Sequence, residues 1–263
     1  MNIGLIIIGD EILSGKRADK HLAKCIELLS QRGLALAWAR YVGDDRTLIT
    51  AALKDAFASG DLVFSCGGIG ATPDDHTRAC AAAALGVELA LHPQAKALIL
   101  ERMQDVAAEQ GLPYEPERED NQHRLNMGMF PLGASIIPNP YNKIAGFSVQ
   151  EVHFVPGFPV MAWPMMEWVL DQRYAHLLGS ARSVERSVIV FGAMEASLTP
   201  LMEDIEAQFA GVKVFSLPSV DHPQWGRHIE LGVKSKADPV QAYAALRAAL
   251  QQFGAKLGPE LVR

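Results

Sequence analysis

The chain has 263 residues, which is long for one domain and sufficient for two. A composition of 49% hydrophobic and 21% charged residues is that of a globular protein and excludes an intrinsically disordered chain. The formal net charge of -6 argues against a general role in binding nucleic acids or membrane surfaces, because both are polyanionic.

The cysteines and the N-terminus bear on the cellular compartment. The three cysteines, Cys25, Cys66 and Cys80, form no C-x-x-C pair, and thiols in a reducing cytoplasm are the simplest interpretation. The apolar run near the N-terminus is too short to span a bilayer and lacks the basic flank and cleavage site of a signal peptide. We therefore expect a cytoplasmic protein with no membrane partner.

Strand and helix patterns alternate along residues 1–177. Residues 3–8 form a continuous apolar run that ends at Gly9, as in a strand buried on both faces of a parallel sheet. The same patterning predicts strands at 34–42, 62–65, 135–137, 147–149 and 152–155, and helices at 19–32, 47–59, 72–85, 93–110 and 160–174. A polar loop is expected at 111–121. The succession predicts an α/β fold with three layers, in which helices cover both faces of a mostly parallel sheet.

The pattern restarts after a segment of Gly, Ser and Arg at 178–182, where we expect a domain boundary. Beyond it, strands are predicted at 184–191, 212–217 and 228–234, and helices at 196–209 and 238–253. These elements predict a small α+β module that is large enough to fold alone. The expected domains are therefore 1–177 and 182–256.

Each of the first three strands is followed by a loop that carries two acidic residues. They are Asp10 and Glu11 in GDEILSG, Asp44 and Asp45 in VGDD, and Asp74 and Asp75 in GGIGATPDD. Because ligands of an open parallel sheet bind outside the carboxyl ends of its strands, we expect these loops to meet at one edge.

Helix capping is the alternative explanation for part of this pattern. Asp75 stands three residues after Thr72, as in a capping box at the start of a helix, and Asp44 could cap the helix that follows it. For these two aspartates, capping and ligand chemistry both remain open. Glu11 has no evident capping role, and capping uses only one acid per helix where each loop has two.

The stretch CGGIGATPDDHT at 66–77 places carboxylates beside a glycine-rich turn. Such a turn before a helix offers backbone N–H groups to an anion, whereas bare carboxylates would repel a phosphate. Bound Mg²⁺ removes this conflict, because carboxylate and phosphate oxygens can share one hard cation. The residues thus predict metal-assisted binding or hydrolysis of a phosphorylated ligand. The turn is neither G-x-x-x-x-G-K-(S/T) nor G-x-G-x-x-G, and Ser14 has no paired histidine that would make it a nucleophile.

These three motifs resemble the molybdopterin-binding domain of the MoaB/Mog type, whose pattern runs approximately G-(D/N/T)-E-L-L-x-G, V-x-D-(D/N) and G-G-x-G-P-T-x-D-D-x-T. The later stretch FPLGASIIPNPYNKIAGF, followed by VHFVPGFPVMAWPMMEWV, is similar to the N-terminal region of the CinA (competence/damage-inducible protein A) family. The resemblance extends to about residue 175. Residues 187–201 resemble the start of that family's small KH-like domain, although no G-x-x-G loop or basic patch indicates RNA binding.

The resemblance implies two kinds of ligand. Molybdopterin-binding domains bind the phosphorylated pterin of the molybdenum cofactor, and CinA-type members have been associated with metal-dependent pyrophosphatase activity on ADP-ribose-like dinucleotides. We therefore expect a Mg²⁺-dependent hydrolase of a phosphoanhydride, or alternatively a non-catalytic binder of molybdopterin or a nucleotide. Family precedent suggests a homo-oligomer. Because the chain ends before the family's deamidase domain, deamidation is not expected.

The resemblance also assigns roles to residues. Asp44 and Asp75 match the acidic pair expected to hold the metal, and Glu11 matches an acid expected to assist or activate water; these three are the predicted catalytic residues. The expected ligand-binding residues are Gly67, Gly68, Gly70, Thr72, Asp74, Ser14, Lys143, Pro156 and Gly157. Lys143 either neutralises ligand charge or is a solvated loop residue. Met161 departs from the pattern, since the family commonly has an acid there, and its loss bears on catalysis more than on binding.

Overall fold

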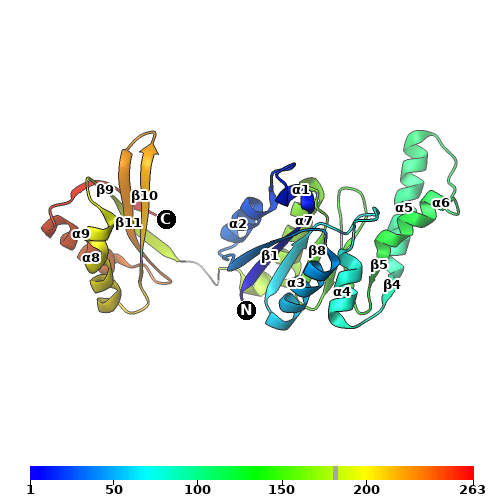
Figure 1. Ribbon diagram of the computed structural model, residues 1–263, viewed down its shortest axis with the longest axis horizontal. Coiled ribbons are helices and arrows are strands. Elements are labelled where there is room, and N and C mark those ends of the chain that lie inside the picture. Colours follow the sequence, from blue (N-terminus) through cyan, green and yellow to red (C-terminus); the bar gives the residue numbers. More distant parts are fainter. Residues whose placement is uncertain (180–182) are drawn as a thin grey trace. The chain divides into compact units, whose positions relative to one another are not determined.

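The computed structural model describes residues 1–179 and 183–263, and the chain divides into two compact units, Met1–Ser180 and Ala181–Arg263 (Figure 1). The expected boundary at 178–182 includes residues 180–182, which lie outside the described residues. No helix in the described part of the chain combines the length and the apolar character needed to cross a membrane.

The first unit is built on a six-stranded sheet with the order β2-β1-β3-β8-β7-β6. Its strands are β1 (Ile3–Ile8), β2 (Trp38–Val42), β3 (Leu62–Cys66), β6 (Ser135–Ile137), β7 (Gly146–Val149) and β8 (Val152–Val155). Strands β2, β1, β3 and β8 are parallel neighbours, whereas β7 pairs antiparallel with both β8 and β6. The carboxyl ends of β1, β2, β3, β8 and β6 therefore meet at the same edge.

Helices cover both faces of this sheet. They are α2 (His21–Gln31) and α7 (Pro159–Arg173) on one face, and α3 (Arg46–Ser59) and α4 (Thr77–Leu85) on the other. Each face of the sheet packs against its helices in a separate hydrophobic core, and alternate residues of β1 point into the two cores. Leu5 packs with α2 and α7, and Ile6 packs with α3 and α4. The predicted three-layer α/β arrangement is confirmed, with a mixed sheet in which β7 is the one strand that runs antiparallel to its neighbours among the described residues.

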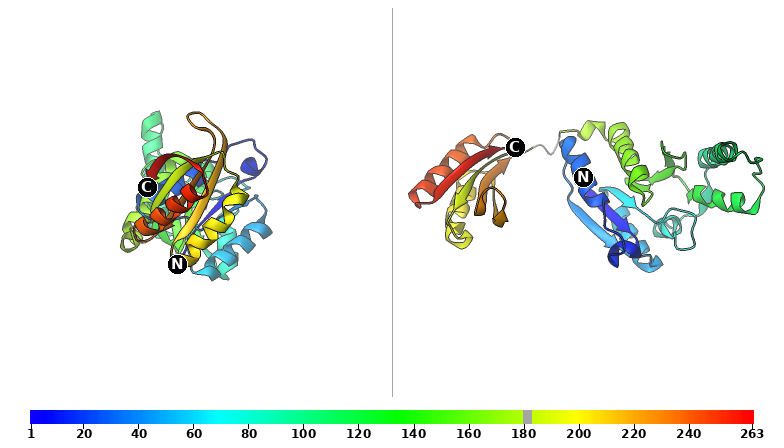
Figure 2. Two further views of the ribbon diagram at one scale, coloured as in Figure 1. Left: turned by 90° about the vertical axis from the view of Figure 1, so that its left-hand side faces the viewer. Right: turned by 90° about the horizontal axis from the view of Figure 1, so that it is seen from above.

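An additional, mostly helical segment lies between α4 and β6. Its elements are β4 (Leu89–Leu91), α5 (Pro93–Gln110), α6 (Glu119–Arg124), the 3-10 turn η1 (Leu125–Gly128) and β5 (Met129–Pro131). Helices α5 and α6 extend from one end of the first unit (Figures 1 and 2). The polar segment expected to be a loop is partly helical, because α6 begins at Glu119. The three-residue strands β4 and β5 were not predicted, since they pair only with each other and are too short to show a periodic pattern.

Two boundaries near the strand ends also differ from expectation. The segment GDEILSG contains a short helix, α1 (Asp10–Leu13), where only a loop was expected. Helix α4 begins at Thr77, with His76 as its N-cap, and not at Thr72. Residues 72–75 form a separate turn instead, in which the N–H of Asp75 donates to the carbonyl oxygen of Thr72 at 3.0 Å.

The second unit is an antiparallel four-stranded sheet, in the order β10-β11-β9-β12, with two helices. Its elements are β9 (Val184–Phe191), α8 (Glu195–Gln208), β10 (Lys213–His222), β11 (Gly226–Ser235), α9 (Val240–Gln252) and β12 (Lys256–Val262). The 3-10 turn η2 (Ala175–Leu177), which precedes these elements, belongs to the first unit. Val188 and Leu231 pack with Leu246 of α9 in the core. The predicted α+β character is confirmed. Strand β12 was missed because its sequence, KLGPELV, contains Gly and Pro, and its register with β9 shifts there.

Candidate functional site

The acidic loops meet at the carboxyl edge of the first unit's sheet, around a cavity of about 460 Å³. The loop after β8 and the loop between β6 and β7 complete its wall. The predicted site residues that line it are Glu11, Asp44, Gly67, Gly68, Gly70, Thr72, Asp74, Asp75, Pro156 and Gly157. The structure therefore brings together most of the residues expected to bind ligand.

Backbone conformation and steric crowding require glycine at two positions of the turn, Gly67 and Gly68, and a third, Gly70, lies close to an acidic side chain. Gly67 has φ 105°, and an added Cβ would lie 2.3 Å from the carbonyl oxygen of Ile8 at the end of β1. Gly68 has φ 68°, and its Cβ would lie 2.1 Å from Oγ1 of Thr77. At Gly70 a Cβ would lie 2.6 Å from a carboxylate oxygen of Asp75. The turn thus packs directly against β1 and the start of α4, and side chains are excluded at Gly67 and Gly68.

The side chains of Thr77 and Arg78, at the start of α4, hydrogen-bond to backbone carbonyl oxygens of the glycine turn. The buried Oγ1 of Thr77 donates to the carbonyl oxygen of Gly67 at 3.1 Å. The guanidinium of Arg78, which is 8% exposed, donates to the carbonyl oxygens of Ile69 and Gly70. In a planar trans peptide the C=O and the following N–H point in opposite directions. The N–H groups of Gly70 and Ala71 therefore point away from Arg78 and are available to an anion.

Arg78 was not recognised from the sequence as part of the site. Burial lowers the pKa of this guanidinium, and the negative charge of Asp75 opposes that effect. A buried cation beneath the turn adds positive potential at the place where an anion would sit. The only sequence signal was an arginine directly after the motif, at the start of an alanine-rich helix.

Asp75 keeps its predicted contact with Thr72 but not the predicted helix start. Its Oδ2 accepts the backbone N–H of Thr72 at 2.8 Å and the hydroxyl of Thr72 at 2.6 Å. These bonds close the turn that precedes α4 and orient the carboxylate toward the cavity. Among the described residues, no hydrogen bond engages Oδ1, so that oxygen retains its capacity to bind a cation.

Asp44 is not a helix cap, because Asp45 has that role. Oδ1 of Asp45 accepts the N–H of Leu48 at 2.9 Å, which is the N-cap contact of α3. Oδ2 of Asp44 instead accepts the N–H of Asp10 at 2.8 Å, and Oδ1 of Asp10 accepts the N–H of Asp44 at 3.1 Å. This reciprocal pair joins the first two acidic loops.

Negative charge accumulates at this edge. Burial raises the pKa of Asp44, and the charges of Asp10, Glu11 and Asp74 raise it further, against the opposing hydrogen bond from the Asp10 backbone. Glu11 lies 4.0 Å from Arg17, and both side chains are substantially exposed. Arg17 is the one basic side chain among the described residues that line the cavity. Excess negative charge of this kind favours a bound cation.

Ser14 and Lys143 are not brought into this cavity. Ser14 lines an adjoining open hollow that it shares with Glu11 and Asp44. Lys143 has φ 65°, and its ammonium pairs with Glu101 at 2.5 Å and with Asp105 at 2.6 Å on α5. These two ion pairs raise the pKa of Lys143.

Two asparagines of the Lys143 loop line the cavity instead. Nδ2 of Asn139 donates to Oδ1 of Asn142 at 2.8 Å, and Nδ2 of Asn142 donates to the sulfur of Met161 at 3.4 Å. All three residues line the cavity. The asparagines stood in the quoted segment NPYNK, but sequence reasoning singled out only its lysine.

The donor set fits a metal that is bound together with a phosphorylated ligand. Within residues 1–179 and 183–263, no three His, Cys, Asp or Glu side chains are grouped so that they could hold a metal ion on their own. Mg²⁺ commonly uses one or two carboxylates together with substrate phosphates. Asp44 and Asp75 line the same cavity as the glycine turn, so their carboxylates suit this shared mode of binding.

Comparison with known proteins shows related sequences and a related structure. Residues 4–176 match the model of a family described as a probable molybdopterin binding domain. A CinA-like protein of Syntrophotalea carbinolica is 31% identical over 80% of this chain and 51% of its own length, and a protein of Pyrobaculum calidifontis is 30% identical over 95% of this chain and 93% of its own. The crystal structure of the protein CinA with unknown function from Thermoplasma acidophilum is 27% identical, with a TM-score of 0.53, and covers 65% of this chain and 98% of its own. The chain thus spans about half the length of the CinA-like relatives that it matches.

Proposed function

Because this chain belongs to the family of molybdopterin-binding domains and, within it, to the CinA-like proteins, we propose that its cavity binds a phosphorylated small molecule with Mg²⁺ and hydrolyses a phosphoanhydride bond in it. The family membership confirms the resemblance predicted from the three acidic motifs. The observation that carries the proposal is the presence, in one cavity, of a glycine turn with outward N–H groups and of carboxylates from three separate loops.

Electrostatics supports a metal as part of the ligand complex. A phosphate on the glycine turn would lie close to Asp44, Asp74 and Asp75, which line the same cavity. Repulsion between such charges in a partly buried site amounts to several kcal/mol at short range. A divalent cation between carboxylate and phosphate converts that repulsion into attraction, so the acidic wall favours metal-bound phosphates over free ones.

The residues of the cavity have distinct expected roles. Asp44 and Asp75 would hold the ion, which when bound would neutralise charge on the phosphates. The N–H groups of Gly70 and Ala71 bind phosphate oxygens and fix their orientation. Glu11 accepts a proton from the attacking water, whose oxygen forms a new bond to phosphorus. The P–O bond of the anhydride breaks, and the second phosphate departs with the electron pair.

A specific observation favours a second candidate, a non-catalytic binder of molybdopterin or a nucleotide. Met161 occupies the wall where the family commonly has an acid, and its sulfur accepts a hydrogen bond from Asn142. A thioether cannot act as a base or as a ligand for a hard cation such as Mg²⁺. The cavity therefore has one fewer group for chemistry, while its binding surface is intact.

An activity screen with a binding measurement separates these candidates. The purified protein is incubated with ADP-ribose or FAD and Mg²⁺, Mn²⁺ or Co²⁺, and AMP is quantified by chromatography. We expect AMP release that depends on the metal and is lost in Asp75→Asn, a change that keeps an oxygen to accept the Thr72 hydrogen bonds. Release of AMP at the same rate by the variant, or by the parent without metal, would contradict the hydrolase. Metal-dependent binding by calorimetry without turnover would support the binder.

A further inference from the structure

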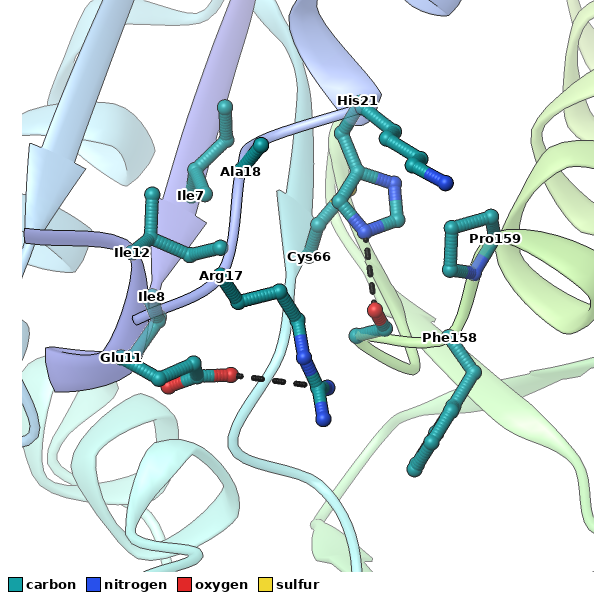
Figure 3. Close-up of a pocket in the computed structure, with 12 residues that line it drawn as sticks. Ile7, Ile8, Glu11, Ile12, Arg17, Ala18, His21, Cys66, Phe158 and Pro159 are labelled. Carbon is teal, nitrogen blue, oxygen red and sulfur yellow. Dashed lines mark hydrogen bonds and ion pairs between the residues drawn. The ribbon is translucent and has the colours of Figure 1, made fainter. Parts of the chain in front are cut away.

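Few side chains in the acidic cavity can donate a hydrogen bond to a ligand. Among the described residues that line it, the side chains with such donors are Arg17, Thr72, Asn139 and Asn142. The hydroxyl of Thr72 already donates to Asp75 at 2.6 Å. The guanidinium of Arg17 reaches toward Glu11, 4.0 Å away (Figure 3), but its side chain is 61% exposed, so water competes for its donors. The contacts of the two asparagines therefore decide which fixed donor a ligand can use.

The loop between β6 and β7, residues 138–145, uses both donors of Asn139 for its own structure. Oδ1 of Asn139 accepts the backbone N–H of Tyr141 at 3.0 Å, which identifies Nδ2 as the donor. That nitrogen donates to the carbonyl oxygen of Ile144 at 2.9 Å and to Oδ1 of Asn142 at 2.8 Å. Asn139 is 4% exposed, and both hydrogens of its amide are engaged inside the loop. It supports the loop and has no donor left for a ligand.

Asn142 is the side chain whose donors are not fully used. Its Oδ1 accepts hydrogen bonds from Nδ2 of Asn139 and from the backbone N–H of Ile144 at 3.0 Å, which fixes the orientation of the amide. Its Nδ2 donates to the sulfur of Met161 at 3.4 Å, and no other contact among the described residues engages this nitrogen. A thioether is a weak acceptor. The amide is therefore held by its oxygen, and its nitrogen is a preorganised donor for a stronger acceptor.

The next residue, Lys143, ties this loop to helix α5. Lys143 has φ 65°, a left-handed backbone conformation that is unfavourable for a residue with a side chain. Its ammonium pairs with Glu101 at 2.5 Å and with Asp105 at 2.6 Å, and its backbone N–H donates to the carbonyl oxygen of Asn139 at 3.0 Å. These contacts hold Lys143 in that conformation, and because Lys143 follows Asn142 directly, they also fix the backbone that carries the Asn142 amide.

We propose that Asn142 donates a hydrogen bond to a phosphate oxygen of the metal-bound ligand, and that Lys143 positions Asn142 through its ion pairs with α5. The proposal rests on the proposed function, because it assumes that phosphates and Mg²⁺ occupy this cavity. It adds a specificity to that site. The Asn142 wall takes an acceptor oxygen directly, with no second cation between them, because an amide N–H and a thioether offer no ligand to a hard cation.

Calorimetric titration with inorganic pyrophosphate in the presence of Mg²⁺ tests the contact. Asn142→Asp keeps the oxygen that accepts from Asn139 and Ile144 but replaces the donor with a carboxylate oxygen, so the affinity should fall by about 100-fold. Asn142→Ala removes the donor without adding charge, and its affinity should fall by about tenfold. Tighter binding by Asn142→Asp than by the parent would place a cation at this wall and overturn the proposal.

A double-mutant cycle tests the positioning role of Lys143. Lys143→Gln should lower the affinity for pyrophosphate by about threefold, and Lys143→Arg, which can keep the ion pairs, should restore it. Added to Asn142→Asp, Lys143→Gln should have no further effect, because the contact that Lys143 positions is already lost. An equal loss in both backgrounds would mean that Lys143 does not act through Asn142.

The matched control is Arg102→Gln, which removes another ion pair of α5, the one with Glu109 at 2.8 Å. This variant should bind pyrophosphate as the parent does. A loss as large as that of Lys143→Gln would assign the effect to α5 in general and overturn the positioning role.

The outcomes separate this proposal from the function on which it rests. If the parent binds pyrophosphate with Mg²⁺ and both Asn142 variants bind it equally well, Asn142 does not contact the phosphate, while the proposed site stands. If the parent does not bind pyrophosphate with Mg²⁺, the proposed function fails, and the role of Asn142 is overturned with it.

Discussion

The adjacent residues Asp44 and Asp45 make different contacts: the carboxylate of Asp45 accepts the N–H of Leu48 at 2.9 Å within α3, whereas that of Asp44 accepts the N–H of Asp10 at 2.8 Å in another loop. One aspartate thus stabilises its own helix, and the other joins two loops at the cavity. Substitutions at these two positions should therefore affect the stability of the fold and the chemistry of the ligand site separately.

We expect Asp45→Ala to lower the free energy of unfolding by about 1 kcal/mol, because it removes the N-cap of α3, and to leave metal-dependent turnover unchanged. Asp44→Ala should instead lower the rate of metal-dependent AMP release by about 100-fold. Urea denaturation and the AMP assay measure the two effects. Loss of activity in Asp45→Ala at temperatures where it is folded would contradict this division of roles.

Gly68→Ala should be strongly destabilising. The residue has φ 68°, and the new Cβ would lie 2.1 Å from the buried Oγ1 of Thr77, so we expect a loss of about 3 kcal/mol in the free energy of unfolding. Gly133→Ala is the matched control, because Gly133 has φ 85° and nothing within 4 Å of an added Cβ. That change should cost only about 1 kcal/mol, from the left-handed backbone alone. Equal losses in the two variants would show that the contact with Thr77 is unimportant.

Arg78 should affect both stability and phosphate binding. Arg78→Met leaves the carbonyl oxygens of Ile69 and Gly70 without donors, so we expect a loss of about 2 kcal/mol in stability and about tenfold in pyrophosphate affinity with Mg²⁺. Arg78→Lys keeps the charge, but a single ammonium group cannot donate to both carbonyl oxygens as the planar guanidinium does. The affinity of this variant for pyrophosphate should therefore lie between those of Arg78→Met and the parent. Calorimetry at a temperature where all three proteins are folded measures this order. Unchanged affinity in Arg78→Met would exclude a role for Arg78 in shaping the turn.

The buried His153 predicts a pH dependence of stability. Its ring bonds to the hydroxyls of Ser148 and Tyr174, and burial lowers its pKa to about 3, with a smaller effect from Arg173. Protons bind this histidine in the unfolded chain from about pH 6.5 downward but bind the folded protein only near pH 3. The stability that the neutral ring contributes is therefore complete above pH 6.5 and decreases as the pH falls.

Relative to His153→Gln, which does not titrate, the free energy of unfolding should decrease by up to about 1.4 kcal/mol per pH unit between pH 6 and pH 4. Urea denaturation of both proteins across this range measures the difference. Parallel pH profiles would mean that His153 is protonated in the folded protein at the same pH as in the unfolded chain.

Much of the architecture followed from local patterns. The apolar run of β1 and the helical spacing of α3 and α5 are signals within one segment, and their predicted limits differ from the observed ones by at most one residue. The meeting of the acidic loops followed from a general property of parallel sheets. The start of α4 could not be predicted in this way. Thr72, Pro73 and Asp75 have the residue types of a helix start, but the same hydrogen bonds can close an isolated turn.

The sequence alone determined which residue types stand at which positions. It places glycines in the turn, acids after each of the first three strands, and the motifs that identify the family. Only the folded chain decided which of them act together. Lys143 and Asn142 are neighbours in one loop, yet the lysine pairs with α5 and the asparagine lines the cavity. The hydrogen bonds from Arg78 to the carbonyl oxygens of Ile69 and Gly70 likewise depend on how the glycine turn folds back over the start of α4. Such contacts are set by side-chain direction and packing in three dimensions, and a one-dimensional pattern contains neither.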